Sequence, residues 1–148
     1  MNMKNDKKEL VLVSACLVGM PCRWDGGSKL DDKAKELFFS GRAILVCPEL
    51  LAGLPTPRPA CELFLRSGQE AVIDADGNDY TKEFIFGAAE GLAIAKKLNI
   101  KKAYLKSGSP SCGAGTVFDG TFTGNKKPGY GLFAKMLIEN GIEVEELK

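Results

Sequence analysis

The sequence predicts a single-domain α/β fold of three layers with a mostly parallel sheet. Its 148 residues are the usual size of one domain with one hydrophobic core. Short continuous apolar runs, which are typical of strands buried on both faces, alternate along the chain with segments of helical period. This alternation is typical of a parallel sheet with helices on both of its faces.

The first half of the chain supplies two buried strands with a helix between them. The strands are predicted at residues 10–15 (LVLVSA) and residues 42–46 (RAILV). Residues 31–40 predict the helix, since Asp31 and Asp32 stand at its positive N-terminal end. A Gly/Pro-containing loop joins the first strand to this helix.

A proline-rich segment follows the second strand. Three prolines exclude a regular helix there and predict an extended, ordered loop over residues 50–68. Residues 71–73 predict a minor strand, and the turn at residues 74–79 (DADGND) begins like a calcium loop. Calcium binding is not expected, because Asp79 replaces the glycine and Ile85 the glutamate that such a loop requires.

The second half predicts two more helices and two more strands. Thr81 is predicted to cap a helix that runs to Leu98, with apolar residues on one face. A strand is predicted at residues 102–106. A helix at residues 129–140, stopped by Gly141, and a last strand at residues 142–145 complete a Rossmann-like order of elements.

Composition argues against several classes of partner. Apolar residues make up 45% of the chain and the net charge is +1, as in an ordinary globular protein. No membrane partner is expected, and a nucleic-acid partner is not favoured. The apolar run before Cys16 is shorter than the roughly 7 to 15 residues of a signal-peptide core, so we expect a cytoplasmic protein. The oligomeric state cannot be predicted.

Cysteine is the residue type that best indicates the chemistry of this chain. Histidine, the commonest general base and zinc ligand, is absent. The odd number of cysteines, without an export signal, makes structural disulfides unexpected and favours thiolate chemistry or metal binding. The five are Cys16, Cys22, Cys47, Cys61 and Cys112.

Three of these cysteines follow predicted strands. Cys16 follows the first strand, Cys47 follows the second, and Cys112 lies in the loop after residues 102–106. In open α/β sheets the site lies at the carboxyl ends of the strands, so the three can meet at one rim. An iron–sulfur cluster, inert buried thiols and thiol redox chemistry all remain open on this spacing.

The loop SGSPSCGAG (residues 107–115) fits neither of two common catalytic turns. It lacks the Lys-Ser/Thr pair of a phosphate loop, and it has no Gly-x-Ser-x-Gly nucleophile turn. Ser109 and Ser111 are on this ground ordinary turn residues. Asp25 in a tight turn predicts bonds to nearby backbone amides, whereas Arg58 on a proline-stiffened loop is suited to an anion or a planar base.

Three segments carry a family resemblance that spans nearly the whole chain, from about Val11 to Glu145. They are SACLVGMPCRWDGG, CPELLAGLPTPRPACE and GSPSCGAGTVFDGTFTG. The chain resembles the bacterial domain family, long labelled as of unknown function, that includes the thiouracil desulfidases. By this resemblance residues 10–148 form a single thiouracil-desulfidase-like domain, preceded by an N-terminal extension at residues 1–9.

The resemblance implies a [4Fe-4S] cluster held by Cys16, Cys47 and Cys112, with its fourth iron open. It implies non-redox hydrolysis of the C–S bond of a small thiolated pyrimidine such as 2-thiouracil, with release of sulfide. Cys22 and Cys61 are left out of the ligand set. Two alternatives stay open: a non-catalytic module that binds a cluster or a thionucleoside, and a redox protein in which Cys22 and Cys61 exchange a disulfide.

The resemblance also implies roles for individual polar residues. Glu49 and Ser109 are expected to transfer protons and position the substrate, with Asp25 as the competing carboxylate. Arg23 and Arg58 are expected to bind the thiolated nucleobase. Trp24 stands where relatives carry another aromatic residue, so stacking on the base is an equal alternative to packing.

Overall fold

Four parallel strands form the central sheet, in the order β2-β1-β5-β8. The computed structural model describes residues 9–148, so the predicted extension at residues 1–9 lies outside the described residues except for Glu9. The strands are β1 (Val11–Ser14), β2 (Ala43–Val46), β5 (Lys102–Lys106) and β8 (Glu143–Leu147). Every pair of neighbours in this sheet is parallel, which confirms the predicted type of sheet.

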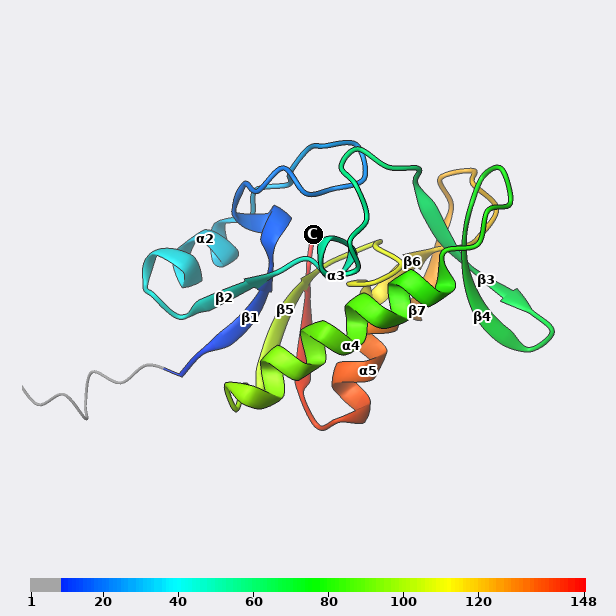
Figure 1. The fold of residues 1–148 in the computed structure, drawn as a ribbon. Coiled ribbons are helices and arrows are strands. Elements are labelled where there is room, and N and C mark those ends of the chain that lie inside the picture. Colours follow the sequence, from blue (N-terminus) through cyan, green and yellow to red (C-terminus); the bar gives the residue numbers. More distant parts are fainter. Residues whose placement is uncertain (1–8) are drawn as a thin grey trace, which may run out of the picture.

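Three helices cover the two faces of this sheet. They are α2 (Asp32–Phe39), α4 (Thr81–Lys97) and α5 (Leu132–Glu139). Successive side chains of a strand point to opposite faces. Leu12 accordingly packs in one core cluster with α4 and α5, whereas Val11 and Val13 pack in another with α2. The predicted three-layer arrangement is therefore confirmed, and Figure 1 shows α4 lying along α5.

Local signals explain several of the helix boundaries. The Asp31 side chain accepts a hydrogen bond from the Ala34 N–H at 3.0 Å, as expected of an N-cap. Gly141 ends the segment after α5 with a φ of 81°. The predicted cap at Thr81 is wrong: Tyr80 is the N-cap, and the Thr81 hydroxyl instead accepts from the Val72 N–H at 2.9 Å.

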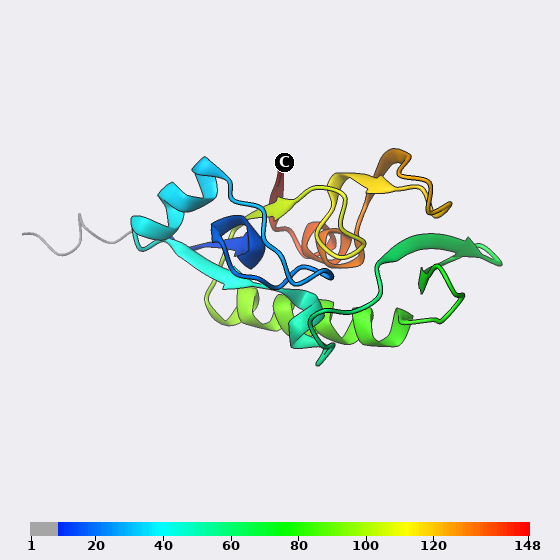
Figure 2. The same cartoon turned by 90° about the horizontal axis from the view of Figure 1, so that it is seen from above.

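Two antiparallel hairpins extend beyond the sheet. The first consists of β3 (Cys61–Arg66) and β4 (Gln69–Asp74), and the second of β6 (Ala114–Phe118) and β7 (Lys126–Tyr130). The prediction of one loop over residues 50–68 is wrong, because all three prolines precede β3 and leave it free to pair. Figures 1 and 2 place β3 and β4 at the opposite end of the molecule from α2.

Short helical turns follow the first two strands of the sheet. The 3-10 helix η1 (Ala15–Val18) follows β1, and α3 (Pro48–Leu51) follows β2. α3 packs closely against α4, because a Cβ on Gly87 would lie 1.9 Å from the Pro48 carbonyl oxygen. Only glycine permits this approach, which fixes the position of the residues after β2. Among the described residues, no helix has the length and apolar character needed to cross a membrane.

A cysteine-lined candidate active site

A cavity of about 640 Å³ opens at the carboxyl ends of β1, β2 and β5. All five cysteines of the chain line it, together with Glu49, Arg58, Ser109 and Ser111. The site therefore lies where an open parallel sheet places one. Segments that are far apart in the sequence supply its walls.

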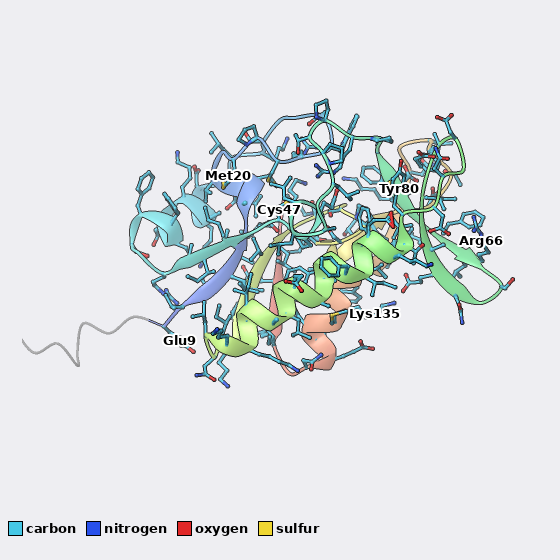
Figure 3. The ribbon with its side chains drawn as sticks, in the orientation of Figure 1. Glu9, Met20, Cys47, Arg66, Tyr80 and Lys135 are labelled. Carbon is cyan, nitrogen blue, oxygen red and sulfur yellow. The ribbon has the colours of Figure 1, made fainter. Side chains whose placement is uncertain are left out.

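Cys16, Cys47 and Cys112 reach the cavity from three neighbouring strands. Cys16 lies in η1 directly after β1, Cys47 is the N-cap of α3 directly after β2, and Cys112 lies in the loop after β5. Since β2, β1 and β5 are adjacent in the sheet, their ends bring the three thiols to one rim. Figure 3 labels Cys47 at the point where the chain leaves β2.

The chemistry of these donors fits an iron–sulfur cluster. Within residues 9–148 no three cysteine or carboxylate side chains converge on a single metal ion. The ligands of a cluster bind different iron atoms, so their sulfurs stay further apart than the ligands of one ion. Three thiols without histidine are also the soft donors that iron–sulfur clusters select.

The surroundings of Cys47 and Cys112 favour the protonated form of both thiols. Burial raises the pKa of the Cys112 thiol to about 12. A hydrogen bond with the Cys22 thiol, followed by burial, raises the pKa of Cys47. Both thiols are therefore protonated near pH 7 in the metal-free chain, and a bound metal cation would offset the cost of ionising them.

Cys22 and Cys61 occupy different parts of the cavity wall. The Cys22 thiol lies within hydrogen-bonding range of the Cys16 and Cys47 thiols, and its pKa is raised to about 11, mainly by Cys16. The Cys61 thiol donates to the Pro59 carbonyl oxygen at 3.6 Å. All five cysteines are free thiols in this structure. Of the two cysteines left out of the predicted ligand set, Cys22 is thus the one positioned to replace a predicted ligand.

Backbone geometry gives the SGSPSCGAG loop its compact shape. Gly108 has a φ of 83°, which favours glycine. A Cβ on Gly113 would lie 2.7 Å from the carbonyl oxygens of both Ser109 and Thr116. The Ser109 hydroxyl accepts hydrogen bonds from the N–H groups of Ser111 and Cys112, at 3.1 and 3.0 Å. These contacts fix Cys112 relative to the two serines.

A chain of hydrogen bonds joins the predicted pair Glu49 and Ser109 through Ser111. The Ser111 hydroxyl donates to Glu49 Oε2 at 2.9 Å and lies 2.9 Å from the Ser109 hydroxyl oxygen. While Ser111 gives its proton to the carboxylate, Ser109 is the donor to Ser111. The chain of donors thus points from Ser109 to Glu49.

Arg58 binds the other oxygen of the same carboxylate. Its Nε donates to Glu49 Oε1 at 2.9 Å, and its Nη2 lies 2.9 Å from that oxygen. The two side chains are 5% and 13% exposed, so the ion pair is largely shielded from solvent. Glu49 Oε1 is therefore fully used by the guanidinium, whereas Oε2 has a free lone pair beside Ser111.

The remaining predicted residues are Arg23, Trp24 and Asp25, and the cavity wall contains the first two. Arg23 and Trp24 line the cavity, and the Trp24 side chain is 45% exposed. Asp25 is exposed, is not among the lining residues, and accepts a hydrogen bond from the Gly27 N–H at 2.9 Å. The structure thus brings Glu49 and Ser109 together with the three cysteines, and gives Asp25 the contact expected of a turn residue.

Sequence reasoning missed the contribution of Ser111. It is 1% exposed and connects Ser109 to Glu49 across 62 positions of the chain. The available signal was the Ser-x-Ser-Cys spacing, which puts two hydroxyls in one turn beside a candidate ligand. Only the packing of that turn on α3 shows that the second hydroxyl faces a carboxylate.

Comparison with known proteins agrees with this geometry. The chain is 38% identical over 141 residues to the uncharacterized protein YbbK of Bacillus subtilis (strain 168), covering 91% of this chain and 93% of YbbK. The solved structure of TudS, a [4Fe-4S]-dependent thiouracil desulfidase, superposes with a TM-score of 0.86 at 42% identity. That match covers 94% of this chain and 91% of TudS.

A family model decides the classification. The model described as 2-thiouracil desulfurase matches residues 11–147, which is almost the entire chain. This match confirms the resemblance inferred from the three segments that contain Cys16, Cys47 and Cys112. The chain belongs to the 2-thiouracil desulfurase family.

Proposed function

We propose that this chain is a [4Fe-4S]-dependent thiouracil desulfidase whose cluster is held by Cys16, Cys47 and Cys112. The observation that carries the proposal is the delivery of these three thiols to one cavity by the adjacent strands β2, β1 and β5. The activity and the cofactor expected from the sequence agree with the matched family and with the solved desulfidase. Residues 10–148 are the proposed catalytic domain.

The reaction replaces the sulfur of the thiolated base by the oxygen of water, giving uracil and hydrogen sulfide from 2-thiouracil. A bound cluster would supply Lewis-acidic, thiophilic iron suited to polarising a thione and accepting sulfide. Substrate and products have the same overall oxidation level, so no external electron donor is required. The remaining steps are proton transfers by the protein.

Glu49 is the proposed general base. Glu49 lines the cavity beside the cysteines. Arg58 holds its Oε1, whereas Oε2 accepts from Ser111 and retains a second lone pair. A water molecule bound next to Oε2 can lose its proton to this oxygen as it attacks the carbon of the thione. The fixed carboxylate thus orients the water as well as accepting its proton.

Ser111 and Ser109 provide a route for returning that proton. Once Oε2 is protonated, it becomes a donor to Ser111. For Ser111 to donate in turn to Ser109, Ser109 must release one of the two backbone N–H groups from which it accepts, because a hydroxyl oxygen has two lone pairs. Ser109 can then donate into the cavity, toward the nitrogen or sulfur that gains negative charge. One proton of the water reaches the products by this route, which returns Glu49 to its ionised form. The second proton leaves the attacking oxygen when the carbonyl group of uracil forms, and completes hydrogen sulfide.

The cavity favours a small thiolated base as substrate. Arg23 and Trp24 supply a cation and an aromatic face on the wall contributed by the loop after η1. An aromatic ring and a guanidinium are suited to stacking on a planar base and to hydrogen bonding with its carbonyl. We propose these two residues as the contacts to the nucleobase.

The test is anaerobic reconstitution followed by a panel of thiolated bases. The reconstituted protein should be brown, should contain iron and sulfide, and should form uracil and sulfide in equal amounts from 2-thiouracil. Glu49→Gln should keep the cluster but lose about 10²-fold or more of kcat.

Two results would contradict this assignment. A fully loaded protein that releases no sulfide from any thiolated base would indicate a binding module. A Glu49→Gln variant of unchanged kcat would remove Glu49 from the reaction.

A further inference from the structure

Arg58 connects three segments of the cavity wall from a buried position. Its Nη2 donates to the Cys22 carbonyl oxygen at 2.8 Å, and its Nη1 donates to the Pro55 carbonyl oxygen and the Thr56 hydroxyl at 3.2 and 3.0 Å. Its backbone N–H donates to the Trp24 carbonyl oxygen at 2.8 Å. Every nitrogen of the guanidinium thus has a partner within the chain.

The Glu49 carboxylate is held from both sides as a result. Oε1 contacts Nε and Nη2 of Arg58, and Oε2 contacts the Ser111 hydroxyl. A planar guanidinium with fixed partners defines both the position and the plane of the carboxylate. Rotation of the carboxylate would break the bonds to Arg58 and Ser111 together.

These contacts argue against the role of substrate contact for Arg58. Its side chain is 5% exposed, and a nucleobase could bind the guanidinium only by displacing Glu49 or a carbonyl group. Arg23 is half-buried at the cavity wall and needs no such displacement. The two arginines therefore differ in function although both line the cavity.

We propose that Arg58 is a positioning residue that aims Glu49 Oε2 at the reacting water and touches neither substrate nor cluster. This inference rests on the proposed role of Glu49 as general base. It predicts that Arg58 acts on the rate through Glu49 alone, and that the position of Glu49 depends on Arg58 whether or not a cluster is bound.

The first experiment does not depend on activity. Crystal structures are compared for cluster-free wild-type protein, Arg58→Lys and Arg58→Met. The control is Arg66→Met, which removes an exposed arginine paired with Asp79 at 3.2 Å. The 2.9 Å bond from Ser111 to Glu49 should persist in wild type and Arg66→Met, and should be broken in Arg58→Met. An unmoved carboxylate in Arg58→Met would overturn the proposal, even if the reconstituted protein had no activity.

The second experiment separates binding from turnover in the loaded proteins. Arg58→Met should keep its iron and its KM for 2-thiouracil within about threefold, and should lose about 10²-fold in kcat, the usual effect of a misplaced catalytic group. Arg58→Lys keeps the positive charge beside Glu49 and should therefore retain more of kcat than Arg58→Met. A raised KM with unchanged kcat would instead assign Arg58 to substrate binding.

A double variant completes the test. If Arg58 acts through Glu49, Arg58→Met should slow the Glu49→Gln enzyme by less than about twofold, because the group it positions is already lost. A further loss of about 10²-fold would show that Arg58 acts independently and would overturn the proposal. If the reconstituted wild-type protein has no activity, the proposed function is refuted. The crystallographic comparison would still show whether Arg58 fixes the position of Glu49.

Discussion

Ser111 illustrates how one buried hydroxyl can determine the use of a carboxylate. It is the link between Ser109 and the lone-pair-bearing oxygen of Glu49. The Ser111 side chain is small, and its hydroxyl contacts Glu49, Ser109 and, at 3.9 Å, the Cys112 thiol. Removal of this one hydroxyl group therefore tests the proton route with little disturbance of the fold.

Ser111→Ala should lower kcat about 10²-fold with little change in cluster content, because it interrupts the route between Glu49 and Ser109. Steady-state sulfide release and iron analysis measure the two effects. Thr121→Ala, on an exposed hydroxyl pair in the β6–β7 loop, is the matched control and should leave both unchanged. A Ser111→Ala enzyme with wild-type kcat would exclude the proton route.

The ligand set can be tested by single cysteine variants. Cys112→Ser should lose most of its iron and visible absorbance after anaerobic reconstitution, since an alkoxide is a poor replacement for a thiolate. Cys61→Ser should retain both, because the Cys61 thiol is engaged with the Pro59 carbonyl group. The Cys22→Ser variant tests whether Cys22, which neighbours Cys16 and Cys47, is a ligand. We expect this variant to keep the cluster.

The contact between α3 and α4 holds the segment that carries Cys47 and Glu49. Gly87→Ala should destabilise the cluster-free protein by about 1–3 kcal/mol, because the new methyl group overlaps the Pro48 carbonyl group. Helix propensity alone would stabilise this variant by about 1 kcal/mol. The sign of the change in the free energy of unfolding therefore shows whether the contact with α3 or helix propensity dominates. Denaturant unfolding measures it, with exposed Ala89→Ser as the near-neutral control.

The turn after β4 adds a pH-dependent contribution to stability. The Asp74 carboxylate accepts hydrogen bonds from the Asn78 side chain and from the N–H groups of Asn78 and Asp76. These bonds, chiefly that of the Asn78 side chain, lower its pKa below the ordinary 3.8. The contribution is therefore present above pH 3.8 and is lost as the pH falls through the lowered pKa.

Asp74→Asn should accordingly destabilise the protein at pH 7, and the difference from wild type should shrink as the pH falls below about 3.8. Urea unfolding of the cluster-free proteins at pH 7 and pH 3 measures this trend. Asp76→Asn, on an exposed neighbour, should show a smaller difference at pH 7. If Asp74→Asn loses the same free energy of unfolding at pH 7 and pH 3, the pH-dependent contribution of the Asp74 carboxylate is refuted.

The elements differ in how well the sequence predicts them. Strands β1 and β5 are predictable because both of their faces are buried, which requires continuous apolar runs such as LVLVS. The edge strand β8 (EVEEL) is largely exposed and lacks such a run. β6 and β7 lack this signal, since β7 (KKPGY) contains lysines, a glycine and a proline. The β6–β7 loop is held by Glu62, which accepts from the N–H groups of Gly120 and Phe122 at 2.9 and 3.1 Å. Such a contact across the chain leaves no local pattern.

Across the molecule, the sequence predicts the position of the site better than the roles of the residues within it. Strand ends predict the meeting of Cys16, Cys47 and Cys112, because parallel strands share one carboxyl edge. The partners of Arg58 are not predictable in this way, since they depend on how the proline-rich loop folds over α3 and the Cys22 segment. Resemblance to a family supplied the cluster and the reaction, which no spacing implies.

The adjacency of β2, β1 and β5 also sets when this protein can acquire its cofactor. The proposed ligands lie at positions 16, 47 and 112, so no short peptide of the chain contains two of them. A nascent chain that ends before residue 112 offers only two of the three proposed ligands, and one that ends before Lys102 also lacks β5, the neighbour of β1 in the sheet. With the proposed ligands, the cluster can therefore be completed only after Cys112, in the last third of the sequence, has been translated.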